Sequence, residues 1–268
     1  MTKTILQFGC GNMGGAMLKG WLAGGIAPET FTIVDPYLDA APEGVRLLKN
    51  APGGEAPFDV VLLGFKPQQL PDAIAMVQPF VGARTLLLSI LAGVDLATLR
   101  AAFPQVKAIV RVMPNLAAAL GKSPIALVGE ADEAAQAQTD ALMAPLGQAE
   151  WLGGEDQMDL VTALAGSGPA FVYRFIDALA KGAAALGLPR AQADRLALSM
   201  VEGAAMLAAA SEHGPAELAR RVASPGGVTQ VGIDVLDQDQ RLVALMTDTL
   251  RGARDRSAEM TAQARART

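Results

Sequence analysis

Residues 5–14 read Ile-Leu-Gln-Phe-Gly-Cys-Gly-Asn-Met-Gly, and this stretch decides the fold. A strand pattern runs into a Gly-x-Gly-x-x-Gly hexamer, which opens a helix-compatible segment. Gly9 permits the tight turn, Gly11 lets the backbone approach a pyrophosphate, and Gly14 lets helix and strand pack closely. The stretch predicts a dinucleotide-binding loop, and the alternative is a glycine-rich turn without a ligand. The residues predicted to bind the cofactor here are Gly9, Gly11, Asn12, Met13 and Gly14.

Short runs rich in Ile, Leu and Val recur through the first half of the chain. Each is bounded by Gly, Pro or polar residues, and helix-compatible segments separate many of them. Continuous apolar strands that alternate with helices indicate a parallel sheet covered on both faces. We therefore expect a doubly wound, Rossmann-like α/β domain over residues 1–151. The predicted strands are residues 5–8, 31–34, 60–63, 85–90, 108–112 and 125–128.

The second half of the chain has helical spacing throughout and predicts an all-α domain over residues 152–268. Pro189 and Pro215 stand where helix starts would place them, and Gly187 and Gly214 stand where helix ends would. The helices are very apolar, so they must pack against the sheet domain or against a second copy, and we favour a homodimer. The sequence does not give the size of the assembly, and a larger ring built from such dimers stays open. The predicted helices are residues 171–186, 190–210 and 238–260.

The composition argues against several classes of protein. Of 268 residues, 51% are hydrophobic and 18% are charged, which leaves ample material for a core and argues against a disordered chain. The net charge of −5 and the aromatic content of 4% argue against a nucleic-acid partner. One Cys and one His leave no basis for a disulfide or for a Cys- or His-rich metal site, so we expect no metal.

The ends and the hydropathy of the chain predict its location. Residues 1–6 lead straight into a strand pattern without the architecture of a signal peptide. Gly, Pro or a charge interrupts each apolar stretch before the roughly 20 residues that a bilayer span needs. We therefore expect a cytoplasmic protein without a membrane partner.

Asp35 ends the second predicted strand, about 20 residues beyond the glycine loop. An acidic side chain at that place accepts hydrogen bonds from an adenosine ribose and would repel a 2′-phosphate. The sequence has no Lys or Arg between Lys19 and Arg46. The predicted cofactor is therefore NADPH or NADH, with Asp35 favouring NADH. The alternative role for Asp35 is that of a turn residue ahead of Pro36.

Four further motifs distinguish this chain from other chains with a Rossmann-like domain followed by a helical one. They are Gly-Phe-Lys-Pro at 64–67, Arg-Val-Met-Pro-Asn at 111–115, Ala-Gly-Ser-Gly-Pro-Ala-Phe at 165–171 and Ser-Pro-Gly-Gly-Val-Thr at 224–229. Together with the glycine loop, this set closely resembles pyrroline-5-carboxylate reductase. The resemblance runs from the first strand to Leu236, and the motif at 224–229 is its most specific part.

The resemblance implies hydride transfer from NAD(P)H to the C=N bond of 1-pyrroline-5-carboxylate, which gives L-proline. Gly226 and Gly227 lack a Cβ at a helix start, so the backbone there can present N–H groups to a carboxylate. Thr229, just inside that helix, can offer its hydroxyl to the imine nitrogen and is the expected catalytic group. By resemblance, the substrate is held by Ser224, Gly226, Gly227 and Thr229, with Ser167 near the same cleft. The nicotinamide half of the cofactor is expected to border Lys66, Pro67, Met113, Pro114 and Asn115.

Two other functions stay open at this point. A related imine reductase or β-hydroxyacid reductase shares the architecture, but hydroxyacid enzymes need a Lys soon after the Gly-x-Gly stretch. After Gly168 the next Lys is Lys181, which argues against alcohol chemistry. A protein that senses NAD(P) without turnover would keep the glycine loop and have no use for residues 224–229. Lys66 is expected to keep its loop solvated or to lie beside polar groups of the cofactor, and His213 is expected to be solvated. Neither is expected to act as a general acid.

Overall fold

The computed structural model of this chain describes residues 4–53 and 57–265. Residues 1–3, on which part of the expectation about the amino terminus rests, lie outside the described residues. The chain forms two compact units. The sheet unit comprises Met1–Ser167 and Gly252–Thr268, and the helical unit comprises Gly168–Arg251. The predicted domain boundary between residues 151 and 152 stays a prediction.

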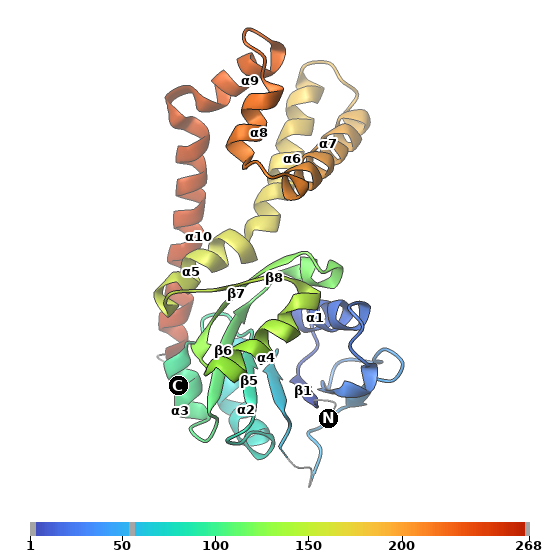
Figure 1. Ribbon diagram of the computed structural model, residues 1–268, viewed down its shortest axis with the longest axis vertical. Helices are drawn as coiled ribbons and strands as arrows, with labels where there is room; N and C mark the ends of the chain where they lie inside the picture. The colour runs from blue at the N-terminus through green and yellow to red at the C-terminus, as the bar shows by residue number, and fades with distance from the viewer. Residues whose placement is uncertain (1–3, 54–56, 266–268) are drawn as a thin grey trace. The chain divides into compact units, whose positions relative to one another are not determined.

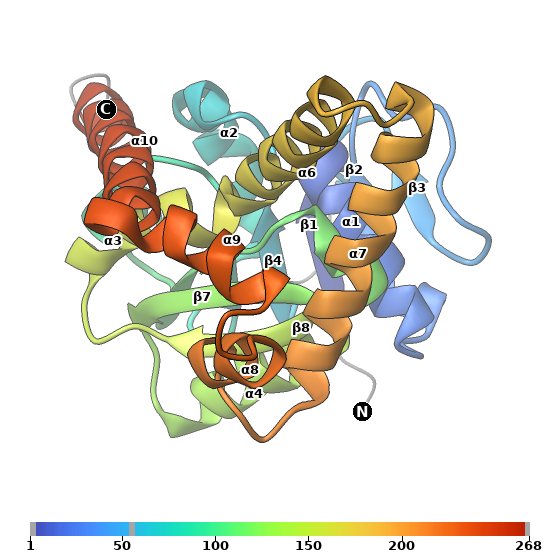
Figure 2. The same cartoon turned by 90° about the horizontal axis from the view of Figure 1, so that it is seen from above.

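Within the described residues, the sheet unit is built on an eight-stranded sheet of order β3-β2-β1-β4-β5-β6-β7-β8. Figure 1 labels β1 and β5 to β8 of this sheet, and Figure 2 labels β2, β3 and β4. The strands from β1 to β6 pair in parallel, β7 is antiparallel to β6, and β8 is parallel to β7. The strand order reverses beside β1, as in a doubly wound fold, and the predicted fold class is confirmed. The strands are β1 Ile5–Phe8, β2 Phe31–Val34, β3 Arg46–Leu48, β4 Val60–Leu63, β5 Leu86–Ser89, β6 Ala108–Met113, β7 Ser123–Glu130 and β8 Gly147–Trp151.

The sheet departs from the sequence prediction at its edges. Strand β3 is only 3 residues long, and β8 alternates exposed and half-buried positions, so neither carries the continuous apolar run of a central strand. Strand β7 runs antiparallel because only a short 3₁₀ turn, η4 (Leu116–Leu120), connects it to β6. A parallel crossover needs a dozen or more residues. Because β3 was not predicted, the Lys66 motif follows β4, the third predicted strand, and the Met113 motif ends β6, the fifth predicted strand.

Helices cover both faces of this sheet. On one face, apolar side chains of α1 and α4 join those of the strands in a single buried cluster. Trp21 of α1 stacks on Phe31 at 5.5 Å between ring centroids and donates its indole N–H to the carbonyl oxygen of Leu142 at 2.7 Å. On the other face, α2 and α3 bury Leu70, Val77 and Leu99 against the strands. The helices are α1 Asn12–Ala23, α2 Leu70–Val77, α3 Leu96–Ala102, α4 Glu133–Met143 and α5 Met158–Val161.

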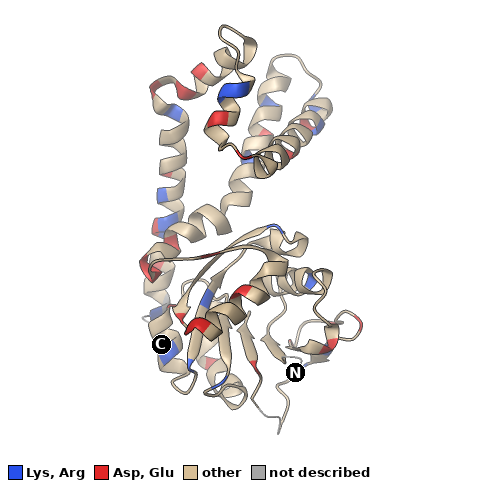
Figure 3. Ribbon diagram, viewed as in Figure 1, with Lys and Arg blue, Asp and Glu red and all other residues tan. Residues whose placement is uncertain are grey.

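The last helix, α10 (Arg241–Arg265), returns to the sheet unit with its carboxyl-terminal part. Ser257 donates its hydroxyl to Asp159 at 2.7 Å, and Arg265 forms an ion pair with the buried carboxylate of Asp95. The backbone of α10 also lies 3.3 Å from where a Cβ on Gly93 would be, so this helix packs directly on the chain after β5. Figure 3 shows charges of both signs interspersed along α10.

The helical unit contains α6 Gly168–Ala185, α7 Arg190–Ala210, α8 Pro215–Val222, α9 Val228–Asp237 and the start of α10. Helices α6 and α7 are joined at one end (Figure 2) and pack through Ala180, Ala193 and Ala197. Gly187 has φ +108 where α6 ends, as expected. The expectation for Gly214 is wrong, because it is the N-cap of α8 and Ser211 ends α7.

Large apolar side chains are exposed along the helices of the helical unit. Within the chain, its buried apolar cluster consists of three alanines, so the unit has little core of its own. Exposed apolar surfaces of this kind mark interaction sites. The exposed residues include Val172, Tyr173, Phe175, Leu186, Leu196, Met206, Leu207, Val231, Val235 and Val243. None of the helices in the described part of the chain is long and apolar enough to span a lipid bilayer.

Candidate functional site

The glycine loop between β1 and α1 is shaped by close backbone contacts. Gly9 has φ +84, and a Cβ there would lie 2.8 Å from backbone atoms of Gly64 and Phe65. Its N–H donates to the carbonyl oxygen of Val34 at 2.9 Å. Gly9 therefore lies where the loop crosses the ends of β2 and β4, and a side chain does not fit there.

Gly14 is fixed by a different contact, with a polar residue inside β1. A Cβ on Gly14 would lie 2.6 Å from Nε2 of Gln7, which is fully buried and donates to the carbonyl oxygen of Gly9 at 2.9 Å. The Oε1 atom of Gln7 has no hydrogen-bond partner among the described residues. The close approach of helix to strand that the sequence predicts at Gly14 is present, and Gln7 lies beneath the loop.

Gly11 has no such contact with the protein. It is the N-cap of α1 with φ −68, and no atom lies within 4 Å of where its Cβ would be. The described residues supply no side-chain cap to this helix, so its first amides remain available as donors. A loop that is open at Gly11 and backed by a helix N-terminus fits the pyrophosphate of a dinucleotide.

Cys10 lies in the same loop and is buried. Burial raises the pKa of its thiol to about 11, and the nearby charge of Asp35 acts in the same direction. The thiol therefore stays protonated at neutral pH, whereas a nucleophilic cysteine needs a lowered pKa. Cys10 therefore fills space in the loop.

Across residues 4–53 and 57–265, no three His, Cys, Asp or Glu side chains gather as metal ligands would.

Asp35, directly after β2, is 8% exposed and bonded on both carboxylate oxygens. Oδ2 accepts from the backbone N–H of Cys10 at 2.7 Å, and Oδ1 accepts from those of Tyr37 at 2.8 Å and Leu38 at 3.2 Å. The carboxylate thus ties the turn after β2 to the glycine loop. Lys49, which the sequence analysis did not single out, donates to the Leu38 carbonyl oxygen of this turn at 2.5 Å.

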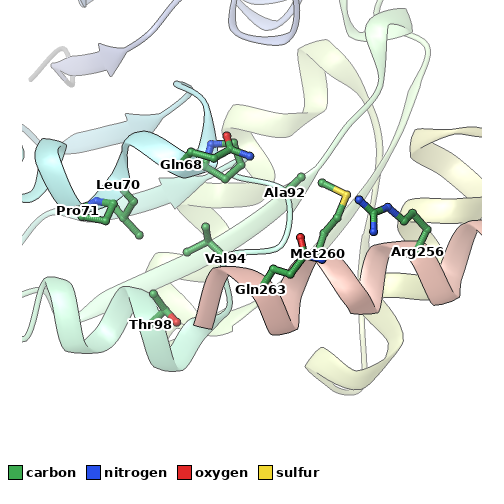
Figure 4. Close-up of a pocket in the computed structure, with 10 residues that line it drawn as sticks. Gln68, Leu70, Pro71, Ala92, Val94, Thr98, Arg256, Met260 and Gln263 are labelled. Carbon is green, nitrogen blue, oxygen red and sulfur yellow. The ribbon is translucent and has the colours of Figure 1, made fainter. Parts of the chain in front are cut away.

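Lys66 and Pro67 follow β4 at the carboxyl edge of the sheet. The exposed Lys66 precedes the short 3₁₀ turn η2 (Pro67–Gln69), and its backbone N–H donates to Oε1 of Gln69 at 3.0 Å. A pocket of about 180 Å³ opens beside this turn, between the chain after β5 and α10 (Figure 4). The residues that line it include Pro67, Gln68, Ala92, Val94, Arg256 and Met260.

The motifs at 111–115 and 165–171, far apart in sequence, meet at Asn115. This residue is buried after β6, and its Nδ2 donates to the carbonyl oxygen of Ala165 at 3.0 Å. Ala165 belongs to a π-helical turn, η7 (Thr162–Gly166), which ends at Ser167. Gly166 lies against Met113, whose sulfur is 3.5 Å from where a Cβ on that glycine would be. The structure therefore brings Met113, Asn115 and Ser167 into one region, and π-helical turns are frequent at functional sites.

An ion pair between the buried Arg111 and the half-buried Glu155 supports the same region. Arg111 of β6 is 5% exposed and donates to Oε1 of Glu155 at 2.7 Å. The same oxygen accepts from the backbone N–H of Leu96 at 2.8 Å. Removing Glu155 would be costly, because the buried charge of Arg111 would lose its partner. The ion pair fixes β6 relative to the segment that leads into η7.

The motif at 224–229 forms the turn between α8 and α9 in the helical unit. Gly226 has φ +69, and Gly227 is the N-cap of α9. The N–H of Gly227 donates to the carbonyl oxygen of Ser224 at 2.9 Å, and a Cβ on Gly227 would lie 2.6 Å from the Ser224 hydroxyl. No side chain of the described residues caps α9, so Ser224 is not its capping residue. Thr229, the second residue of α9, is exposed.

Each set of predicted residues is assembled within its own unit. The glycine loop, Asp35 and the motifs at 64–67 and 111–115 belong to the sheet unit, and the motif at 224–229 belongs to the helical unit. Sequence reasoning missed Gln7 and Lys49. The signal for Gln7 was present, since it is a polar residue inside an apolar strand. Lys49 becomes visible only once β3 is recognised beside β2.

Comparisons with known proteins agree on one family. Residues 155–260 match the family model described as pyrroline-5-carboxylate reductase dimerisation. The pyrroline-5-carboxylate reductase of Pseudomonas aeruginosa is 36% identical over 269 residues, which covers 98% of each chain. Pyrroline-5-carboxylate reductase 2 of Bacillus subtilis is 34% identical, with 97% of this chain and 96% of that protein covered.

A solved structure matches over the same length. The structure of a pyrroline-5-carboxylate reductase from Coxiella burnetii superposes with a TM-score of 0.90 at 28% identity. The match covers 97% of this chain and 99% of that chain, so both the sheet unit and the helices have counterparts there.

Proposed function

The chain belongs to the pyrroline-5-carboxylate reductase family, and we propose that Thr229 is its catalytic hydroxyl. The enzyme catalyses the NAD(P)H-dependent reduction of the C=N bond of 1-pyrroline-5-carboxylate to L-proline. This reaction is the last step of proline biosynthesis. The proposal also assigns the substrate carboxylate to the turn at 224–229 and the cofactor to the sheet unit.

The observation that carries the substrate assignment is the uncapped N-terminus of α9. Gly226 takes a left-handed conformation, and Gly227 stands at the N-cap without a side chain, so the first amides of α9 are accessible to a ligand. Backbone N–H groups at a helix N-terminus bind carboxylates well, because the helix dipole adds to their hydrogen bonds. Ser224 and Ser167 add hydroxyls to the proposed substrate site.

The proposed mechanism uses few protein groups. The reduced nicotinamide, when bound, supplies the hydride. Electron density builds on the ring nitrogen as the C=N bond is reduced, and the Thr229 hydroxyl donates a hydrogen bond at that nitrogen. The proton itself arrives with an iminium substrate or through a water. Thr229 thereby orients the ring and stabilises developing charge, and it does not act as a nucleophile.

The cofactor assignment follows the geometry of the sheet unit. Gly9 and Gly14 hold the loop in a tight conformation, and Gly11 leaves room for the pyrophosphate. Asn12 and Met13 open α1 and present its first turn. The nicotinamide half is proposed to border Lys66, Pro67, Met113, Pro114 and Asn115.

A substrate panel separates this function from its alternatives. Purified protein is mixed with pyrroline-5-carboxylate and NADH or NADPH, or with a set of β-hydroxyacids and NAD⁺ or NADP⁺, while nicotinamide absorbance is followed. We expect oxidation of NADH or NADPH with the imine and no change with the hydroxyacids. Lys181, the first Lys after Gly168, is already paired with Asp177 at 2.7 Å, which further disfavours alcohol chemistry.

Asp35 is proposed to bias the enzyme towards NADH, and its replacement tests this. Asp35→Ser removes a negative charge beside the adenosine ribose, so the NADPH/NADH ratio of kcat/KM should rise about tenfold. Asp35→Asn is the matched variant, since it removes the charge and keeps one oxygen for the backbone amides. A wild-type enzyme with a strong preference for NADPH would contradict the assigned role of Asp35.

The helical unit is proposed to form a homodimer, and such dimers could build a larger ring. The family match to a dimerisation model and the exposed apolar side chains of α6, α7 and α9 support this assembly. Obligate interfaces bury on the order of 2,000 Å² or more. Sedimentation at low micromolar concentration should therefore give a dimer or a multiple of it. Met206→Glu should dissociate it, while Tyr37→Glu in the sheet unit should not. An active wild-type monomer would contradict the proposal.

A cytoplasmic location also stays a proposal. It is supported by the hydropathy of the sequence and by the family's biosynthetic role. Fractionation of cells that express the full chain, with immunodetection, tests it directly.

A further inference from the structure

Charged side chains hold the turn after β2 from two sides. Asp35 accepts hydrogen bonds from the backbone amides of Tyr37 and Leu38. Lys49, directly after β3, donates through Nζ to the carbonyl oxygen of Leu38 at 2.5 Å and lies 3.4 Å from that of Pro36. The turn thus carries a buried carboxylate and an exposed ammonium.

The same turn is fixed to the glycine loop. Oδ2 of Asp35 accepts from the backbone N–H of Cys10 at 2.7 Å. Strands β1 and β2 pair in parallel and end together, with Phe8 opposite Val34. In a doubly wound sheet the ligand lies outside these carboxyl ends, and the residue after the second strand faces the adenosine ribose. A dinucleotide with its pyrophosphate on the loop would therefore have its ribose beside this turn.

The two charges differ in what they can still bind. Three backbone amides occupy the oxygens of Asp35, and only 8% of this residue is exposed. Lys49 is exposed, and an ammonium has three N–H donors, of which the two carbonyl oxygens take two. The remaining donor and the positive charge suit a phosphate oxygen, which lysine binds as a point charge.

We propose that Lys49 is a specificity-determining residue that lets this enzyme accept the 2′-phosphate of NADPH. The inference rests on the proposed cofactor site and adds the group that recognises the ribose substituent. Asp35 and Lys49 then act in opposite directions at one turn. Their balance sets the ratio in which the two cofactors are used, so removing either charge shifts that ratio.

The test compares nucleotides with and without the 2′-phosphate. Lys49→Met keeps the length of the side chain and removes its charge. Calorimetry on the full-length proteins measures binding of adenosine 2′,5′-bisphosphate and of adenosine 5′-monophosphate. Affinity for the bisphosphate should fall about 10- to 100-fold in the variant, as for a lost hydrogen bond to a charged group. Affinity for the monophosphate should change less than about threefold, because that ligand has no 2′-phosphate.

Lys107→Met is the matched control for charge and exposure. Lys107 precedes β6 at the amino edge of the sheet and pairs with Asp132, so its loss should leave both affinities unchanged. Equal weakening of the binding of both nucleotides by Lys49→Met would assign Lys49 to holding the turn and overturn the proposal. An unchanged affinity for the bisphosphate would overturn it as well. If wild-type protein binds neither nucleotide, the proposed cofactor site itself fails, and this inference with it.

Discussion

Replacing Thr229 with Val should lower kcat/KM for pyrroline-5-carboxylate by roughly ten- to a thousandfold, by analogy with the loss of one oxyanion donor. The substitution keeps the volume of the side chain and removes the hydroxyl proposed to stabilise charge on the ring nitrogen. Thr229 is exposed near the start of α9, so the fold should not suffer. Steady-state kinetics with a fixed saturating cofactor measures the effect.

Two controls separate this role from a general disturbance of the site. Thr229→Ser retains a hydroxyl and should recover most of the activity, and the affinity of Thr229→Val for NAD(P)H should hardly move. His213→Ala should turn over near the wild-type rate, because His213 stands in the turn before α8, where its backbone N–H, which the variant keeps, donates to the Ser211 hydroxyl. An unchanged kcat/KM in Thr229→Val, or a folded but inactive His213→Ala enzyme, would refute these assignments.

Replacing Gly11 with Ala should abolish cofactor binding without unfolding the protein. Without a bound cofactor, the glycine loop tolerates the new methyl group, since φ of Gly11 is −68 and no other part of the protein lies within 4 Å of the Cβ position. The loss of an N-cap glycine costs at most about 1 kcal/mol, or a few degrees in Tm. The same methyl group would occupy the place where the pyrophosphate approaches the backbone, so the Kd for NAD(P)H should rise at least about 100-fold.

Two other glycines provide control variants for this experiment. Gly9→Ala should lower Tm strongly, because φ is +84 and the Cβ would meet backbone atoms at 2.8 Å. Gly53→Ala, with nothing within 4 Å and no place in the loop, should change neither Tm nor binding. If Gly11→Ala binds NAD(P)H as the wild type does, the pyrophosphate does not lie on this loop.

Local patterns were enough to predict the centre of the fold. Strand β1, the glycine loop and α1 follow from a contiguous stretch whose apolar run and glycines leave few conformations. The long helices α6 and α7 were likewise predictable from their spacing. Strands β3 and β8 were not, because edge strands are short or half-exposed and lack a continuous apolar run.

The parts of the site that depend on distant pairs could not be predicted. Asn115 reaches Ala165 across 50 residues, and Arg265 of α10 pairs with Asp95 across 170. Neither contact has a local sequence signal. Lys49 reaches the turn after β2 only because β3 pairs with β2, and β3 was itself missed. The motifs were therefore readable from the sequence, whereas the contacts that join them were not.

The product of the reaction tests the assigned function most directly. Purified full-length protein is given pyrroline-5-carboxylate with NADH and, separately, with NADPH, and both nicotinamide oxidation and L-proline are quantified over time. L-proline should appear in an amount equal to the NADH or NADPH consumed. Consumption without L-proline, or no consumption with either cofactor by a folded enzyme, would contradict the assigned function.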